Sequence, residues 1–279
     1  MARGMTGRIA ANDTGRMPAV RLGTLGWGTV SWLVVIVLAA VWEGLARSGI
    51  VTAFMLPPLS VVLERIYDDA QTGDLFINLG LTLYRALAGF AIATAAGIVL
   101  GIAIARVGAV RWFFDPIISV GFPMPKIAFL PIVVLWFGFH DFSKIAMVVF
   151  DATFPVLTAT IAATHAVERE LLWSARSMGA NDRQILHEVV LPAALPEVIT
   201  GLQVALPIAL IVCIVAEMLT GGVGLGGAMI TASRFANSPG VFAGIVEIAV
   251  VGYLLIRGMT LLRRRLLAWH AESQAPPTV

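Results

Sequence analysis

Apolar and polar stretches alternate along this chain on the length scale of a lipid bilayer. About 20 apolar residues in helical conformation cross the hydrocarbon core. Six stretches meet this length and are predicted as membrane-spanning helices: 27–46, 79–105, 112–138, 143–164, 194–219 and 240–262. The third contains Pro123 and Pro125, which must bend or break its helix. The pattern therefore predicts an all-α integral membrane protein with six transmembrane helices.

A shorter amphipathic stretch, FMLPPLSVVLERIYDDAQTGDLF (54–76), separates the first two predicted spans. Ser60 follows two prolines and is placed to cap a helix. That helix has an apolar and a charged face, formed respectively by Val61, Val62, Leu63 and Ile66 and by Glu64, Arg65, Asp68 and Asp69. We predict a helix that lies at the membrane interface or in a loop and does not span.

The polar segment 165–193 has the pattern of two short helices joined at a glycine. Residues 168–178 show helical spacing, and Gly179 suits the position just past a helix end, where a positive φ favours glycine. Asn181 and Gln184 have the spacing of a capping box, which predicts a second helix over about 182–190. Two capped helices indicate a rigid element that could dock on a partner, although a polar loop that merely joins two spans is the plainer interpretation.

Two prolines follow this second helix. We expect Pro192 to stop it and Pro196 to open the fifth span near its first turn. The spans and the short cytoplasmic helices would then be separate elements.

The composition agrees with a protein embedded in lipid. Hydrophobic residues make up 58% of the chain and charged residues only 13%, whereas a soluble domain is about a quarter charged. The net charge of +2 does not indicate nucleic-acid binding, because the basic residues lie at the ends of apolar stretches and not on one soluble module. The single cysteine, Cys213, excludes an internal disulfide and a cysteine-rich metal site, and its plain interpretation is a small core or lipid-facing residue.

The basic residues also predict an orientation. With six spans both termini share one side, and that side carries Arg3, Arg8, Arg16, Arg21, Arg106, Arg111, Arg169, Arg176, Arg183, Arg263, Arg264 and Arg265. The opposite side carries Arg47, Arg65, Lys144 and Arg234. Since cytoplasmic loops hold the excess of Lys and Arg, both termini and segment 165–193 are predicted to be cytoplasmic. The stretch 27–46 is then an uncleaved first span, since it exceeds the length of a signal-peptide core.

Charged residues inside predicted spans are costly and are candidates for function. They are Arg85, Lys126, Asp151, Glu217 and Glu247. We expect a polar translocation path formed by Arg85, Pro123, Pro125, Lys126, Asp151 and Glu217. The alternative is intramembrane pairing that fixes the bundle, for example Arg85 with Glu217 or with Asp151. The two cations would suit an anionic substrate.

Other patterns exclude chemistry. The run GGVGLGG (221–227) lacks the lysine of a phosphate-binding loop, and we interpret it as an extracytoplasmic turn with close helix contacts. The four histidines, His140, His165, His187 and His270, have no metal-ligand spacing, and no catalytic cluster is visible. We expect no enzymatic activity and no cofactor bound by this chain.

Several blocks together resemble one family. They are LPPLSVVLERI (56–66), DPIISVGFPMPKIAFLPIVVLWFG (115–138), ARSMGANDRQILHEVVLPAALPEVITGLQVAL (175–206), AEMLTGGVGLGGAMITASRF (216–235) and RRRLLAWH (263–270). They resemble the inner-membrane permeases of binding-protein-dependent ABC importers, in the nitrate, sulfonate and taurine branch. The third block is similar to the cytoplasmic loop through which such permeases contact their ATPase.

The resemblance implies a type I ABC importer permease fold with coupling helices at about 168–192. Residues 1–26 and 266–279 would be cytoplasmic tails, 27–53 the first transmembrane helix with the start of a periplasmic loop, and 54–265 the permease core. The residues that it assigns to ATPase coupling are Glu170, Trp173, Ala175, Gly179, Ala180, Asp182, Leu191 and Pro192. The family often has Glu-Ala-Ala where this chain has Trp173, Ser174 and Ala175, so either Glu170 or Glu168, about one turn upstream, would replace the usual glutamate.

The expected function is ATP-driven import of a small anionic solute such as a sulfonate, taurine or nitrate, by alternating access. The implied partners are two copies of a separate cytoplasmic ATPase, which uses the ATP, a periplasmic or lipid-anchored solute-binding protein, and a second copy of this chain in the inner membrane. Three alternatives remain: a permease for pyrimidine precursors or aromatic acids, a proton-coupled secondary transporter using Asp151 and Glu217, and a membrane enzyme.

Overall fold

The structure is a computed structural model that describes residues 27–269, so the predicted tail 1–26 with its four arginines and residues 270–279 lie outside the description. In the described part the chain is helical, with no strand. Its α-helices are α1 (Trp27–Arg47), α2 (Leu59–Thr72), α3 (Asp74–Arg106), α4 (Gly108–Gly121), α5 (Leu130–Phe137), α6 (Asp141–His165), α7 (Arg169–Ser177), α8 (Asp182–Gln184), α9 (Leu191–Thr220), α10 (Leu225–Arg234) and α11 (Ser238–Leu266). A 3-10 helix, η1 (Lys126–Phe129), precedes α5, and a π-helix, η2 (Ile185–Val190), precedes α9.

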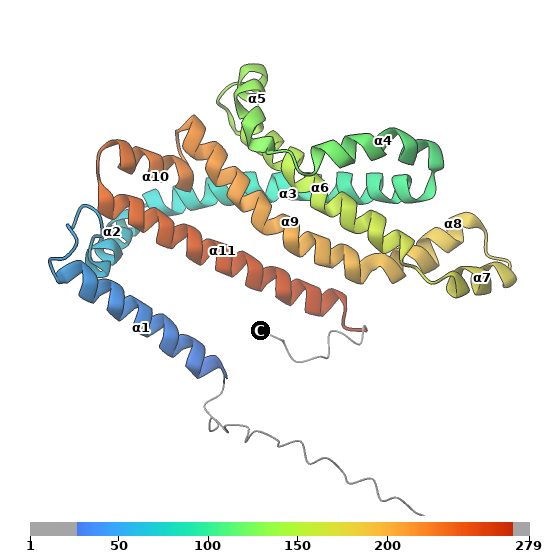
Figure 1. The fold of residues 1–279 in the computed structure, drawn as a ribbon, viewed down its shortest axis with the longest axis horizontal. Helices are drawn as coiled ribbons and strands as arrows, with labels where there is room; N and C mark the ends of the chain where they lie inside the picture. The colour runs from blue at the N-terminus through green and yellow to red at the C-terminus, as the bar shows by residue number, and fades with distance from the viewer. Residues whose placement is uncertain (1–26, 270–279) are drawn as a thin grey trace, which may run out of the picture.

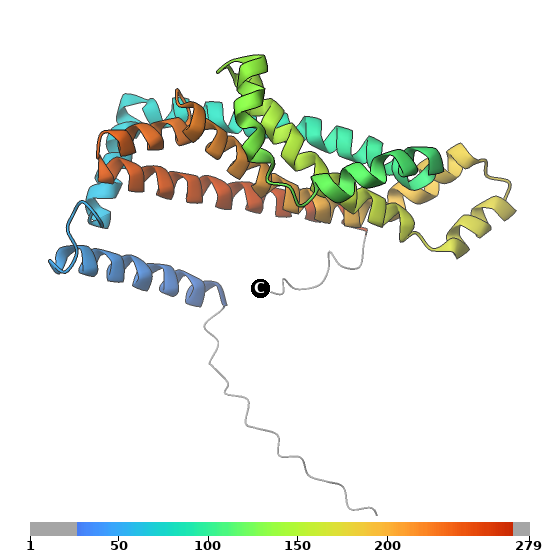
Figure 2. The ribbon, with the colours of Figure 1, turned by 45° about the horizontal axis from the view of Figure 1, so that its top comes forward.

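Long helices run side by side and set the length of the molecule (Figures 1 and 2). In both views α7 and α8 lie at one end, α2 and α10 lie at the other, and α5 projects from the body. The short helices α2, α7, α8 and α10 therefore lie at the ends of the bundle, and the long helices run between them.

Four helical segments are long and apolar enough to cross a membrane: Asp74–Arg106, Asp141–His165, Asp182–Thr220 and Ser238–Leu266. The predicted bend or break of the helix at Pro123 and Pro125 is confirmed, because Gly108–Gly121 and Lys126–Phe137 meet at 94°, and they count as a fifth span only together. The first predicted span lies in α1, which is not among these segments. The six predicted spans thus correspond to four, or five with the bent pair, in the part of the chain that the structure describes.

Pro192 does not stop the helix before it, so that prediction is wrong. Asp182–Thr220 is one helical run of 39 residues in which Pro192 lies in the first turn of α9. The preceding turns are π-helical, and the N–H of Leu191 donates to the carbonyl of Leu186, five residues back. This wider turn gives the pyrrolidine ring room that an α-helical turn would deny it.

Ser60 does not cap α2, which begins after Pro58 without a side-chain cap. Its hydroxyl donates to Glu43 at 2.9 Å and accepts from Arg47 at 3.0 Å, and both partners lie on α1. The indole N–H of Trp42 donates to the carbonyl of Pro57 at 3.0 Å. These bonds fasten the end of α1 to the start of α2, while residues 32–38 of α1 stay largely exposed, as suits a surface that faces lipid.

The core lies where α3, α6 and α9 meet, and small residues allow the helix backbones to approach. Gly89, Gly97 and Gly101 of α3 face Val148, Val156 and Thr160 of α6. A Cβ at Gly97 would lie 2.8 Å from the Cβ of Val156. Cys213 is fully buried in this core, which confirms its interpretation as a small core residue.

We expect Gly97→Ala to destabilise the protein by about 1–3 kcal/mol, because the added methyl cannot fit without shifting a helix backbone. The measurement is resistance of the purified chain to unfolding in a denaturing-detergent titration. Gly80→Ala is the matched control on the same helix, since a Cβ there meets nothing within 4 Å. Equal stability of the two variants would contradict the close α3–α6 contact.

Candidate functional site

The polar segment 165–193 forms an elbow at one end of the bundle, made of α7, the turn at Gly179, α8 and η2 (Figure 1). Gly179 has a φ of +86°, as predicted for the residue past a helix end. The predicted capping box is confirmed: the side chain of Asn181 accepts from the N–H of Gln184 at 2.9 Å, and that of Gln184 accepts from the N–H of Asn181 at 2.9 Å. Local features therefore fix the corner of the elbow: α7 ends at the positive φ of Gly179, and α8 begins at the capping box of Asn181 and Gln184.

The inner side of the elbow is a small apolar core. Ala175 of α7 packs with Ile185 and Val190 of η2, and all three are buried. Among the predicted coupling residues, Glu170, Trp173, Gly179, Asp182 and Pro192 are exposed, Ala180 and Leu191 are half-buried, and Ala175 is buried. Ala175 thus holds the two helices together and does not contribute contact surface.

The outer side of the elbow carries exposed apolar side chains. Trp173 is 59% exposed and Met178 is 79% exposed, and Leu171 also faces outward. A rigid polar elbow with apolar side chains on its outer surface is a shape suited to docking on another protein.

At the other end of the bundle, a buried polar cluster joins α3, α6 and α9. Nη1 of Arg85 donates to the carboxylate of Glu217 at 2.6 Å. Nη2 and Nε of the same guanidinium donate to Oδ1 of Asp141 at 2.6 and 2.8 Å. Thr82 donates to the carboxylate of Glu217 at 2.9 Å. Arg85 and Glu217 are 4% and 0% exposed, so this ion pair is out of contact with solvent. The pairing of Arg85 with Glu217 is one of the two that the sequence suggested.

The glycine run after α9 folds back onto this cluster. Arg85 donates to the carbonyl of Val223 at 2.7 Å, and the N–H of Gly226 donates to Glu217 at 3.1 Å. Gly224 has a φ of +136°, and a Cβ there would lie 2.5 Å from the carboxylate carbon of Glu217. The interpretation as a turn with close helix contacts is confirmed, because only glycine fits at Gly224.

A second ion pair lies at the break between α4 and α5. The ammonium of Lys126 is 3.3 Å from Asp151 of α6 and 4.5 Å from the ring centroid of Phe154. Arg85 therefore does not pair with Asp151. Pro123 and Pro125 are exposed beside this pair. The two ion pairs include all four charged residues Arg85, Lys126, Asp151 and Glu217, which favours the interpretation that intramembrane pairing fixes the bundle. That these residues line a translocation path stays a prediction.

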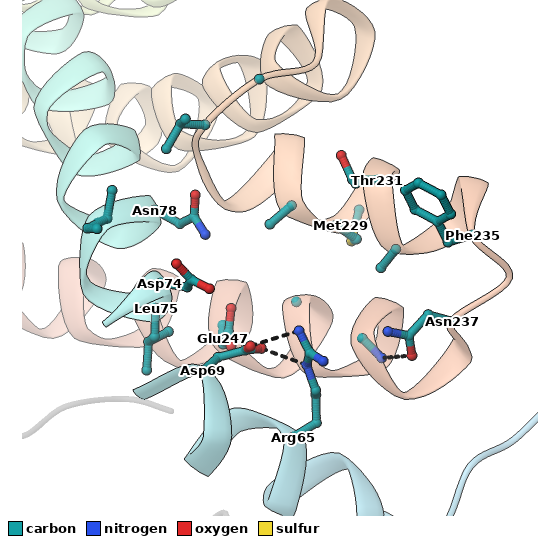
Figure 3. Close-up of a pocket in the computed structure, with 17 residues that line it drawn as sticks. Arg65, Asp69, Asp74, Leu75, Asn78, Met229, Thr231, Phe235, Asn237 and Glu247 are labelled. Carbon is teal, nitrogen blue, oxygen red and sulfur yellow. Dashed lines mark hydrogen bonds and ion pairs between the residues drawn. The ribbon is translucent and has the colours of Figure 1, made fainter. Parts of the chain in front are cut away.

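A cleft of about 560 Å³ opens between α2, α3, α10 and α11, near the glycine turn (Figure 3). Arg65 and Asp69 pair across one turn of α2 at 2.8 Å. Glu247 of α11 and Asp74 of α3 also line the cleft. Asp69 was predicted on the charged face of its helix, and this face borders the cleft that Glu247 also lines. No group of side chains in residues 27–269 has the arrangement of a metal site.

Two residues of the polar cluster were missed by the sequence analysis. Asp141 lies just before the predicted span 143–164 and so was not counted among the charges inside spans, and Thr82 is an ordinary helix residue until Glu217 is placed next to it. The available signal was the pair of charged residues Asp141 and Lys144 at the predicted start of a span.

Comparison with known proteins gives consistent results. The sequence model of a family described as "Binding-protein-dependent transport system inner membrane component" matches residues 97–268. The chain is 35% identical over 264 residues to the taurine transport system permease protein TauC of Escherichia coli (strain K12), covering 93% of this chain and 94% of that protein. It is 34% identical over 235 residues to SsuC of Bacillus subtilis (strain 168), which carries the name of an aliphatic sulfonates transport permease, covering 84% and 85%.

The fold is also found among solved structures. A crystal structure of an amino acid ABC transporter superposes with a TM-score of 0.57 at 16% identity, covering 70% of this chain and 92% of that chain. The similarity at this identity concerns the fold alone, and it agrees with the arrangement of long helices described above.

We expect Arg85→Met to destabilise the protein by about 3–5 kcal/mol, because it leaves the carboxylate of Glu217 buried without a cation. Glu217→Gln in the same chain should recover part of that loss, since the amide keeps an acceptor for Thr82 and Gly226. A double-mutant cycle measured by detergent unfolding gives the coupling. The exposed pair Glu43–Arg47, also 2.6 Å apart, is the control and should show much weaker coupling. Additive effects at Arg85 and Glu217 would contradict a buried ion pair.

Proposed function

Because this chain belongs to the binding-protein-dependent transport system inner membrane component family, we propose that it is the permease of an ABC importer whose solute is a small sulfonate. The relatives named for taurine and aliphatic sulfonates support this substrate class. The two buried cations Arg85 and Lys144 at one end of the bundle suit an anionic solute. The chain itself is a transport component, and ATP hydrolysis is assigned to a separate subunit.

One observation carries the mechanism: a single helical run joins the two ends of the molecule. Asp182–Thr220 starts in the elbow and ends beside the cluster of Glu217, and 39 residues at 1.5 Å per residue span about 58 Å. A displacement of the elbow would therefore reach the polar cluster along one continuous helical run. This is the connection that alternating access requires, in which closure of an ATPase at one end opens the path at the other.

The elbow is proposed to contact the ATPase, with Trp173 and Met178 as apolar contacts and Glu170 and Asp182 as polar ones. All four side chains face away from the bundle. Two ATPase copies and a second copy of this chain would complete the pathway. The projecting α5 supports a second copy, since Leu135 and Trp136 on it are 82% and 70% exposed (Figures 1 and 2).

The proposed orientation places the elbow on the cytoplasmic side of the membrane. Arg106, Arg111, Arg169, Arg176, Arg183 and Arg263 to Arg265 lie at the ends of helices on the elbow side. Since cytoplasmic loops of inner-membrane proteins hold the excess of basic residues, the elbow would face the cytoplasm and the glycine turn the binding protein. Both termini would then be cytoplasmic.

The first experiment is gentle purification of the tagged chain from its native membrane, followed by identification of the proteins that accompany it. We expect an ATPase to co-purify, and uptake of taurine into vesicles to depend on ATP in the lumen and on the binding protein. Uptake driven by a proton gradient without ATP would overturn the proposal in favour of a secondary transporter. Uptake of pyrimidine precursors without taurine would overturn the substrate class alone.

The elbow is tested separately. We expect Gly179→Pro to reach the membrane but to lose ATPase co-purification and at least about tenfold in uptake, because proline cannot adopt a φ of +86°. Gly73→Pro is the matched control: Gly73 also has a φ of +86° and open space around it, but it lies at the opposite end of the molecule. If both variants lost the ATPase equally, or if neither did, the elbow would not be the docking element.

A further inference from the structure

A hollow of about 380 Å³ lies between α3, α6 and the turn that follows α9. Arg85 and Lys144 line it together with His140, Asp141 and the turn residues Gly222 and Val223. Its volume is within the range of about 300–1,000 Å³ that is typical of small-molecule sites. The hollow is separate from the cleft of Figure 3, which lies on the other side of the glycine turn and carries acidic side chains.

One buried cation at the hollow has no carboxylate partner in residues 27–269. Arg85 and Lys144 are 4% and 3% exposed, and Glu217 is the one carboxylate near them that is fully buried. The side chain of Asp141 is 47% exposed. The ammonium of Lys144 donates to the carbonyl of Phe139 at 3.1 Å and makes no ion pair within residues 27–269. Arg85 thus has two carboxylate partners, Asp141 and Glu217, whereas Lys144 is a buried cation without one in the described residues, and an entering anion would pair with it.

The start of α6 adds positive potential to the same place. His140 occupies the N-cap position without a side-chain cap, and Ser143 uses its hydroxyl to donate to the carbonyl of His140. The first N–H groups of this 25-residue helix are therefore not satisfied by a capping side chain. Free N–H groups at a helix start favour anions.

Asp141 occupies the edge of Arg85 that borders the hollow. One oxygen of its carboxylate accepts from two guanidinium nitrogens at 2.8 and 2.6 Å. Since half of this side chain is exposed, it can leave for solvent, while Glu217 on the opposite edge cannot. An incoming anion could then take the place of Asp141 on Arg85.

We propose that this hollow is a transit site for the sulfonate group of the transported solute. Lys144 provides a buried cation without a carboxylate partner in the described residues, the start of α6 provides N–H donors, and Arg85 becomes available when Asp141 swings out. The identity of the ligand rests on the proposed function, whereas the positive charge of the site rests on the buried side chains of Arg85 and Lys144. In the proposed orientation it is the first buried cationic place that a solute meets after it leaves the binding protein.

The test uses a reagent that carries an ethanesulfonate group. Val223→Cys, in a chain with Cys213→Ser, places a thiol on a half-exposed residue at the rim of the hollow. Its thiolate attacks 2-sulfonatoethyl methanethiosulfonate, forms a mixed disulfide and releases methanesulfinate. The rate is divided by that of the trimethylammonioethyl analogue, in lipid vesicles without binding protein. The chain without Val223→Cys is the blank.

We expect the anionic reagent to be favoured, and Lys144→Met to lower the rate ratio roughly tenfold or more because a buried unit charge is lost. Lys144→Arg should keep the ratio. Arg234→Met is the matched control, since Arg234 is an exposed cation on α10 that does not line the hollow. Taurine or methanesulfonate should slow the labelling, and neutral dimethyl sulfone should not.

A ratio unaffected by Lys144→Met would overturn the proposal, provided that Lys144→Arg and Lys144→Met reach the membrane equally. Equal protection by the neutral sulfone would also overturn it. Protection by binding protein but not by free sulfonate would show that the hollow receives an acidic side chain of that partner. These rates need neither ATP nor the ATPase, so a failure here leaves the co-purification and uptake results intact and can be told apart from failure of the proposed function.

Discussion

The buried carboxylate of Glu217 is the constraint on which one whole end of the molecule depends. A fully buried anion in an apolar bundle requires a cation and several donors, and here they come from two other helices, α3 and α10. Arg85 and Thr82 arrive on α3, the N–H of Gly226 arrives from α10, and Asp141 of α6 joins through Arg85. The glycine turn must pass so close that a side chain at Gly224 would overlap the carboxylate. The burial of Arg85, the approach of α3 and α10 to α9, and the conformation of the glycine turn are thus all tied to the carboxylate of Glu217.

The two ends of the bundle are stabilised by different physics, and α9 belongs to both. The elbow depends on local signals, namely a positive φ at Gly179, a capping box at Asn181 and an apolar contact at Ala175. The far end depends on contacts between residues more than 130 positions apart, such as Arg85 with Glu217. Local signals allow the elbow to keep its shape when it moves as a body. Long-range ion pairs couple helices, so a shift of α9 changes the surroundings of Arg85.

This difference explains what could be predicted from the sequence. The spans of α3, α6, α9 and α11, the break at Pro123 and Pro125, and the caps of the elbow follow from periodicity and from single residue types, and the structure confirms them. The continuation of the helix through Pro192 did not follow, because a π-helical turn is a tertiary adjustment without a residue signature. Ser60 was read as a cap and instead bonds to α1, and Asp141 was missed. Partner choice among polar side chains is decided by the packed helices and cannot be read from the local sequence.

The contacts also separate what is rigid from what can hinge. α3 and α6 meet through Gly89, Gly97 and Gly101, where the backbones leave no space for a methyl group, so these helices cannot slide without a clash. The bent pair of α4 and α5 is joined to α6 through Lys126, with one ion pair to Asp151 and one ring contact with Phe154. An ion pair can be broken and remade at a different geometry, whereas interlocked backbones cannot. Motion during transport is therefore expected at the Pro123–Pro125 break, relative to a body formed by α3 and α6.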